Sequence, residues 1–153
     1  MDLESAEREK RAKELDTLFK TLMGDGHELI GAARCSLFIL DRPANELWSK
    51  VATGASEVIR VPADKGFVGA CVKSKQIISV DDAYDDSRFN RSVDEATNFK
   101  TRSVMCVPVL NDAGDVVAVV QMINAERGVF DANDEKLGRM LAKHVAIFMA
   151  EIE

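Results

Sequence analysis

The sequence predicts an α+β fold, with a helix at each end of the chain and a β-sheet between them. Near both ends, apolar residues recur at steps of three and four, which is the periodicity of an amphipathic helix. The interior instead holds short β-type runs separated by turn-forming residues. At 153 residues the chain has the length of one domain. We expect the two terminal helices to cover one sheet face and the less regular middle of the chain to cover the other.

The first predicted element is a helix over residues 4–32. Gly24-Asp25-Gly26 interrupts its pattern, and we expect a kink there. The first 13 residues are highly charged, which predicts a helical stalk or linker at residues 1–13 before a domain at 14–153. The apolar stripe of the helix consists of Leu15, Leu18, Phe19, Leu22, Leu29, Ile30 and Ala33. Three of these leucines are seven residues apart, so the stripe suits either the sheet or a second subunit.

The remaining elements follow from the alternation of strand and turn signals. Strands are predicted at 35–41, 46–52, 57–61, 76–80, 103–110 and 115–123. A short helix is predicted at 66–72, and the polar stretch 81–98 reads as a loop with a helix near 91–96. Asp131 is a suitable N-cap for a last helix from residue 132 to the C-terminus. Its apolar stripe is Leu137, Met140, Leu141, His144, Val145, Phe148 and Ile152.

Composition limits the possible functions. The formal net charge of −6 disfavours nucleic-acid binding, which depends on neutralising phosphates. No apolar run approaches the ~20 residues of a membrane span, and no signal-peptide core follows Met1, so we expect a cytoplasmic protein. The three cysteines, Cys35, Cys71 and Cys106, lie in apolar runs, which predicts buried free thiols. His27 and His144 are isolated from other ligand types, and no metal site is expected.

Five segments in order resemble GAF domains of cyclic-nucleotide phosphodiesterases and some adenylyl cyclases. Residues 35–41 resemble their first strand; 59–69 resemble I-R-I-P-x-x-x-G-I-x-G; 80–89 resemble I-x-D-A-Y-x-D-x-R-F; 101–109 resemble T-R-S-I-L-C-x-P-I. The fifth is Asn124, Phe130, Asp134 and Glu135, which match N-K-x(n)-F-x3-D-E with Ala125 in place of the lysine. The resemblance covers about residues 14–150. It implies a six-stranded antiparallel sheet, terminal helices on one face, and ligand-capping helices and loops on the other.

The resemblance also implies a function. Such a domain catalyses nothing. It binds a cyclic nucleotide and signals through its terminal helices to a linked output domain, such as a phosphodiesterase or a cyclase. We therefore expect no cofactor beyond the nucleotide ligand, and a homodimer formed through the terminal helices.

Carried onto this sequence, the resemblance implies a ligand site. A helix N-terminus favours an anion, so the phosphate is expected at the backbone of Phe67 and Val68. Thr53 corresponds to a position that reads the base edge, and threonine cannot accept two donors as a carboxylate can, which favours cAMP over cGMP. The full set of expected ligand residues is Ser36, Thr53, Phe67, Val68, Asn90, Asp94, Thr97, Thr101 and Gln121.

The last motif has a structural role in the family, where its lysine pairs with the aspartate. Ala125 therefore leaves Asp134 without its usual partner, and Arg127 is the candidate to replace it. Two alternatives remain. One is a ligand-free dimerisation module. The other, an enzyme of the methionine sulfoxide reductase type, needs reachable thiolates, which cysteines in apolar runs do not provide. A tetrapyrrole is disfavoured because the capping region lacks Cys and His.

Overall fold

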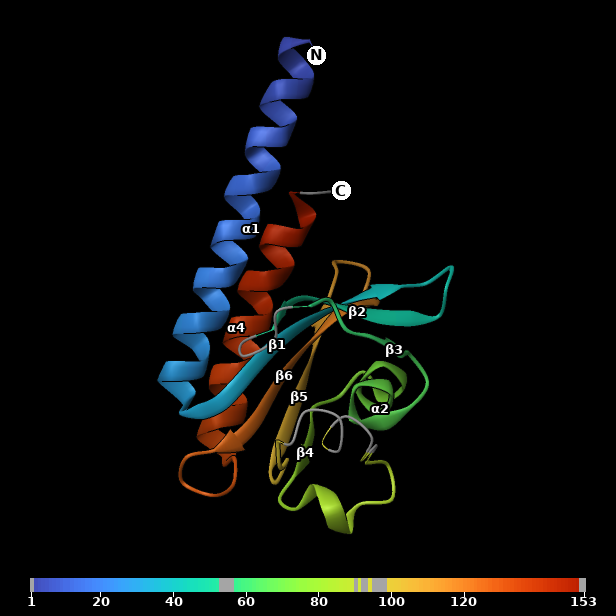
Figure 1. Cartoon of the computed structure of the whole chain (residues 1–153), viewed down its shortest axis with the longest axis vertical. Helices are drawn as coiled ribbons and strands as arrows, with labels where there is room; N and C mark the ends of the chain where they lie inside the picture. The colour runs from blue at the N-terminus through green and yellow to red at the C-terminus, as the bar shows by residue number, and fades with distance from the viewer. Residues whose placement is uncertain (1, 53–56, 90, 92–93, 95–98, 152–153) are drawn as a thin grey trace.

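A computed structural model of the chain describes residues 2–52, 57–89, 91, 94 and 99–151. Six antiparallel strands form one sheet in the order β3-β2-β1-β6-β5-β4. Helices α1 (Leu3–Ile30) and α4 (Ala132–Ala150) pack side by side on one face, and α2 (Gly66–Ser74) lies on the other (Figure 1). The predicted α+β fold and its layers are confirmed.

The strands agree with the predicted ones, with shifted ends. They are β1 (Ala32–Asp41), β2 (Glu46–Ala52), β3 (Arg60–Pro62), β4 (Ile78–Val80), β5 (Val104–Leu110) and β6 (Val116–Ala125). The two predicted strands that prove shortest, β3 and β4, are the edges of the sheet, where each has a partner on one side only. A 3₁₀ turn, η1 (Ala83–Asp85), follows β4. Of the helix predicted near 91–96, Asp94 is helical and most other positions lie outside the described residues.

Helix α1 differs from the prediction in two ways. It runs as one uninterrupted 28-residue helix through Gly24 and Gly26. Its buried residues are Leu15, Phe19, Met23, Gly26 and Ile30. The predicted stripe is wrong at Leu18 and Leu29, which are exposed, and at Ala33, which is exposed and belongs to the strand that follows. The reason is that a 3.6-residue helix lying on a sheet buries positions at steps of four and three, and a strict seven-residue spacing drifts off that face.

The sheet separates two apolar cores. On the helix side, Phe19 is fully buried and meets Phe148 edge-on, with ring centroids 5.9 Å apart. On the α2 side, Phe67, Val68 and Cys71 pack against the sheet. Before Leu15, no described residue of α1 is buried, and this part of the helix projects past the rest of the molecule (Figure 1). The stalk boundary at residue 13 remains a prediction.

Gly24 is a site where a substitution should stabilise the domain. A Cβ added there would meet nothing within 4 Å. Glycine inside a helix costs ~1 kcal/mol relative to alanine, because its unfolded chain has more freedom to lose. We expect Gly24→Ala to raise the free energy of unfolding by about 1 kcal/mol and Tm by about 2–4 °C in calorimetry.

Gly26→Ala is the matched control for that change. Its Cβ would lie 2.8 Å from Leu141 Cδ2 on α4. The gain in helix propensity is then offset by displacement of Leu141 from the core. An equal gain from both substitutions would contradict this account of the α1–α4 contact.

Candidate functional site

Beneath α2, a row of residues crosses the sheet with two polar side chains at its centre. Ser36 on β1 lies opposite Ala52 on one side and Gln121 on the other, and Gln121 lies opposite Cys106. Both polar side chains are half-buried. Gln121 Nε2 lies 3.7 Å from Cys106 Sγ. Because strand side chains alternate between faces, Ser36 and Gln121 share the α2 side with Phe38 and Val119.

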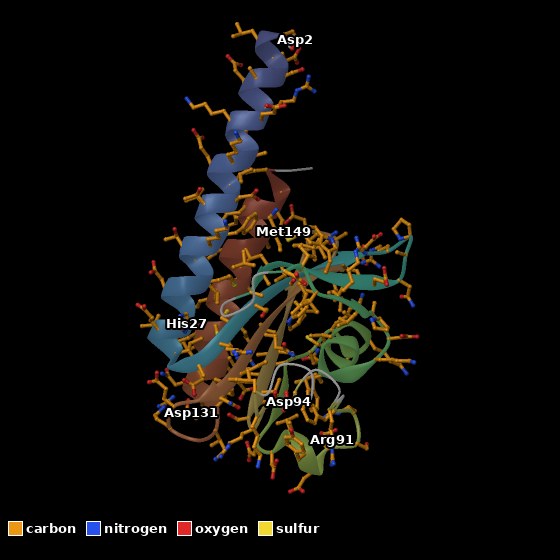
Figure 2. The ribbon with its side chains drawn as sticks, viewed as in Figure 1. Asp2, His27, Arg91, Asp94, Asp131 and Met149 are labelled. Atoms are coloured by element: carbon orange, nitrogen blue, oxygen red, sulfur yellow. The ribbon has the colours of Figure 1, made fainter. Side chains whose placement is uncertain are left out.

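The connection between β4 and β5 carries a buried carboxylate, Asp94. Its Oδ2 accepts hydrogen bonds from Thr101 N at 2.7 Å and from the Tyr84 hydroxyl at 2.8 Å, and its Oδ1 accepts one from Thr101 Oγ1 at 2.7 Å. Asp94 and Thr101 are both buried. Figure 2 shows Asp94 beside Arg91 on the α2 side of the sheet. Asp94 therefore fastens the two ends of this connection together. The sequence did not indicate Tyr84, although its hydroxyl on a polar segment was an available signal.

Aromatic and charged side chains pack the loop that follows β4 against the N-terminal turn of α2. Phe89 stacks on Phe67 at 6.0 Å and meets Tyr84 edge-on at 4.9 Å. Arg88 lies over the Phe67 ring and donates two hydrogen bonds to Asp86. These hydrogen bonds lower the pKa of the Asp86 carboxyl to about 2. The loop that follows β4 is thus held against the first turn of α2.

The N-terminus of α2 carries the expected phosphate position. Gly66 adopts a positive φ of 69°, and the N-cap residue, Lys65, makes no side-chain capping hydrogen bond. The side chains of Phe67 and Val68 belong to the core, so only their backbone N–H groups can serve a ligand. Three other expected ligand residues, Thr53, Asn90 and Thr97, lie outside the described residues.

Asn124 fastens the start of β5 to the end of β6. Its backbone is left-handed, with φ of 59°. Its Oδ1 accepts a hydrogen bond from Arg102 N at 2.6 Å, and its Nδ2 donates to Lys100 O at 2.9 Å. The motif residue Phe130 is buried in the helix-side core. Asn124 therefore holds the segment before β5, and Phe130 anchors the loop after β6 in the helix-side core.

Asp134, in the first turn of α4, has a cationic partner, and it is Arg127, the candidate that the sequence offered in place of the missing lysine. Arg127 Nη2 lies 2.6 Å and 2.7 Å from its two carboxylate oxygens. Asp134 and Asp131 also form a reciprocal capping box, each hydrogen bond being 2.9 Å. Arg127 thus supplies the charge that Ala125 lacks. Ala125 is buried in the helix-side core, and Glu135 is half-buried beside the cap.

All three cysteines are buried thiols outside any disulfide, as predicted. Burial raises the pKa of the Cys35 and Cys71 thiols to about 12, and that of Cys106 further. At neutral pH they are protonated and weakly nucleophilic. Within the described part of the chain, no group of His, Cys, Asp and Glu side chains could hold a metal ion, and no helix there is long and apolar enough to cross a membrane.

A groove of about 1270 Å³ lies on the helix face, away from Ser36 and Gln121. It runs between α4 and the β5–β6 turn. Its apolar part includes Val107, Ala142, Ala146 and Ile147, and Ile147 is 61% exposed. This side of α4 is therefore an open surface on which apolar side chains lie among charged ones such as Glu135, Arg139 and Lys143.

The six-stranded sheet, the polar row beneath α2 and the loop from Asn124 to Asp134 together define the class of this α+β domain. The chain belongs to the GAF domain family, whose sequence profile matches residues 14–149. It is 30% identical over 146 residues to the probable 3',5'-cyclic phosphodiesterase pde-5 of Caenorhabditis elegans, covering 87% of this chain and 20% of that protein. It is 32% identical over 126 residues to the dual 3',5'-cyclic-AMP and -GMP phosphodiesterase 11A of Takifugu rubripes, covering 73% and 14%. The chain thus spans a fifth or less of these relatives.

Solved structures agree on the fold. The GAF domain of a phosphoenolpyruvate-protein phosphotransferase from Coxiella burnetii matches with a TM-score of 0.80 at 19% identity, covering 94% of this chain and 90% of that one. A type II free methionine-R-sulfoxide reductase from Thermoplasma acidophilum matches with a TM-score of 0.78 at 14% identity, covering 93% and 96%. Because one match is an enzyme, the fold alone does not decide between regulation and catalysis.

Proposed function

We propose that this GAF domain is a regulatory sensor that binds a cyclic nucleotide on the α2 side of its sheet. The observation that carries the proposal is the half-buried polar pair Ser36 and Gln121, at the centre of an otherwise apolar face and beneath α2. Polar groups on such a face need partners, and a bound ligand supplies them. The kinship to GAF regions of cyclic-nucleotide phosphodiesterases supports the choice of ligand.

The proposed site has a place for the anion. The N–H groups of Phe67 and Val68 belong to the first turn of α2, where the helix dipole favours negative charge. A cyclic phosphate carries one negative charge and suits this turn. Gly66 allows the ligand to approach the backbone closely.

Gln121 is the proposed contact to the base. Its planar amide carries both a donor and an acceptor, which suit the amino group and a ring nitrogen of adenine and equally O6 and N1–H of guanine. The preference therefore rests on Thr53, which lies outside the described residues and cannot accept two donors as a carboxylate can. On that ground we propose cAMP over cGMP.

The terminal helices are the proposed output. β1 follows α1 and β6 leads toward α4, and these two strands are neighbours at the centre of the sheet. Exposed apolar side chains lie on both helices: Leu18, Leu29, Met140 and Ile147. We propose that these helices form a homodimer and connect the domain to a catalytic or signalling domain; the relatives that it matches are phosphodiesterases, of which it spans a fifth or less.

A ligand-free dimerisation module is the second candidate, favoured by the same exposed side chains and by the open groove beside α4. Reductase chemistry is disfavoured because all three thiols are buried and their pKa values are raised.

Titration calorimetry with cAMP and then cGMP, on protein freed of co-purified nucleotide, tests the proposal. We expect saturable binding with Kd of about 10 μM or better for cAMP. Gln121→Leu and Ser36→Ala should each weaken binding by about tenfold, the effect of one lost hydrogen bond. Ser74→Ala, an exposed hydroxyl on α2, is the control. If neither nucleotide binds at ~1 mM, a Kd that corresponds to a binding free energy of about −4 kcal/mol, the dimerisation module is the function that remains.

A further inference from the structure

One charged side chain on the α2 side of the sheet, that of Arg34, has no polar partner among the residues that the structure describes. Arg34 lies on β1 two residues before Ser36, so the two side chains share one face of the sheet. Arg34 is half-buried. No described carboxylate forms an ion pair with it, and no described group accepts a hydrogen bond from it. Because donors that lose water without gaining an acceptor are costly, a bound molecule with acceptors suits this position.

The ring of Phe99 fixes the plane of this guanidinium. Arg34 Cζ lies 3.6 Å from the centroid of that ring, so the ring covers one flat face of the group. A ring in that position leaves open the N–H donors that lie in the guanidinium plane. β1 and Phe99 together therefore hold a planar fork of donors on the α2 side, and such a fork binds two adjacent acceptors.

Arg34 and Gln121 are diagonal neighbours across β1 and β6. In the register of these strands Arg34 lies opposite Ile123, and Ser36 lies opposite Gln121. Diagonal neighbours on one face of an antiparallel pair are about 7–8 Å apart, a separation that long side chains span. A base held by Gln121 therefore lies within reach of the Arg34 donors.

The two purines differ at the edge beside the one that Gln121 contacts. Guanine presents two acceptors there, O6 and N7, the pair that arginine binds most often in nucleic acids. Adenine presents N7 and an amino group, and the amino group is a donor, as arginine is. O6 of guanine has two lone pairs and accepts from both Gln121 and Arg34. The fork therefore finds two acceptors on guanine and one on adenine.

We infer that Arg34 is a specificity-determining residue of the ligand site, which binds O6 and N7 of guanine and so admits cGMP beside cAMP. The inference rests on the proposed function and goes beyond it, because it narrows the preference for cAMP. One bidentate contact to a base changes affinity by about tenfold or more. We therefore expect the Kd for cGMP to lie within about tenfold of the Kd for cAMP.

The first measurement needs no substitution. Titration calorimetry on the wild-type domain compares cGMP with 7-deaza-cGMP, in which a C–H group replaces N7 while O6 and N1–H remain. The analogue lacks one of the two acceptors of Arg34, and we expect it to bind about tenfold more weakly than cGMP, the effect of one lost hydrogen bond to a charged group.

The second measurement repeats the titrations on Arg34→Met, which keeps an unbranched side chain over Phe99 and removes every donor. This variant should bind cGMP about tenfold more weakly and cAMP at most about threefold more weakly. It should bind cGMP and 7-deaza-cGMP equally. Arg34→Lys keeps the charge without the planar fork, and should recover little of the affinity for cGMP.

Arg42→Met is the matched control. Arg42 follows the other end of β1, where it donates to Val116 O at 2.7 Å. Its loss should leave the ratio of the cAMP and cGMP affinities unchanged.

Each other outcome has one meaning. Equal weakening of cAMP and cGMP by Arg34→Met, or 7-deaza-cGMP that binds the wild-type domain as tightly as cGMP, would overturn the specificity role of Arg34. A domain that binds cAMP and not cGMP would overturn it as well. A domain that binds neither nucleotide overturns the proposed function, and the inference with it.

Discussion

Gly69→Ala is expected to lower the free energy of unfolding by about 3 kcal/mol, at the upper end of what overpacking costs. A Cβ at Gly69 would lie 2.7 Å from the carbonyl carbon of Asp64 and 3.2 Å from the carbonyl oxygen of Ala63. These neighbours are backbone atoms of the turn that enters α2, and they cannot rotate away as a side chain can. Either this turn or the whole helix must move, and α2 carries Phe67, Val68 and Cys71 of the core.

The measurement is urea unfolding of the variant beside Gly138→Ala. At Gly138 the nearest atoms to a new Cβ are Val107 Cγ2 at 3.0 Å and Met105 Cε at 3.2 Å, both in side chains. Met105 can adjust, and the gain in helix propensity offsets part of the crowding, so we expect a loss of about 1 kcal/mol or less there. If the two substitutions cost the same, backbone proximity is not the reason that position 69 is glycine. Gly69→Ala should also weaken nucleotide binding, since the proposed phosphate site is the displaced turn.

Asp134→Ala is expected to cost about 3 kcal/mol. The carboxylate is 1% exposed and bonds both to Arg127 and to the N–H of Asp131. Its removal takes away the reciprocal half of a capping box, worth ~1 kcal/mol, and the buried partner of an ion pair. The loss lies at the low end of the range for such pairs, because the Arg127 side chain is 59% exposed and regains water.

A double-mutant cycle isolates the ion pair. Arg127→Met leaves the buried carboxylate without its cation and should itself cost about 2–3 kcal/mol. The double variant Arg127→Met with Asp134→Ala should cost at least about 1 kcal/mol less than the sum of the losses from Arg127→Met alone and Asp134→Ala alone. Strictly additive losses would mean that the two side chains do not interact in solution. Ala125→Lys should not improve on the natural pair, because position 125 is buried and Asp134 is already paired.

The elements of the fold were predictable because each leaves a local pattern. The hairpin between β5 and β6 has turn residues, and α4 has a visible N-cap in Asp131. The buried face of α1 was harder to predict, because it depends on which side of the helix the sheet covers. Met23 and Gly26 are buried where the sequence suggested Leu18 and Leu29. Gly26 read as a possible break, and its actual neighbour, Leu141, is 115 residues away on α4.

The candidate site was predictable in part. The resemblance placed Ser36 and Gln121 in one ligand set, and strand register brings these two residues, 85 positions apart, opposite each other. The contacts made by Asp94 were not predictable, because the hydroxyl of Tyr84 and the N–H of Thr101 reach it across loops without periodicity. The ion pair of Arg127 was predictable only as a candidate, since a loop must turn back to bring it onto Asp134. The ligand roles of all nine expected residues, Ser36 and Gln121 included, remain predictions.

The two short edge strands affect whether the sheet of this domain can pair with the sheet of a neighbouring domain. An exposed edge strand is a template for pairing with another protein and for aggregation. Here both edge strands have three residues. In β3, Pro62 offers no N–H, and Arg60 is charged and bound to Glu46 at 3.0 Å. Pairing of the sheet with the sheet of a neighbouring domain is therefore disfavoured at both edges.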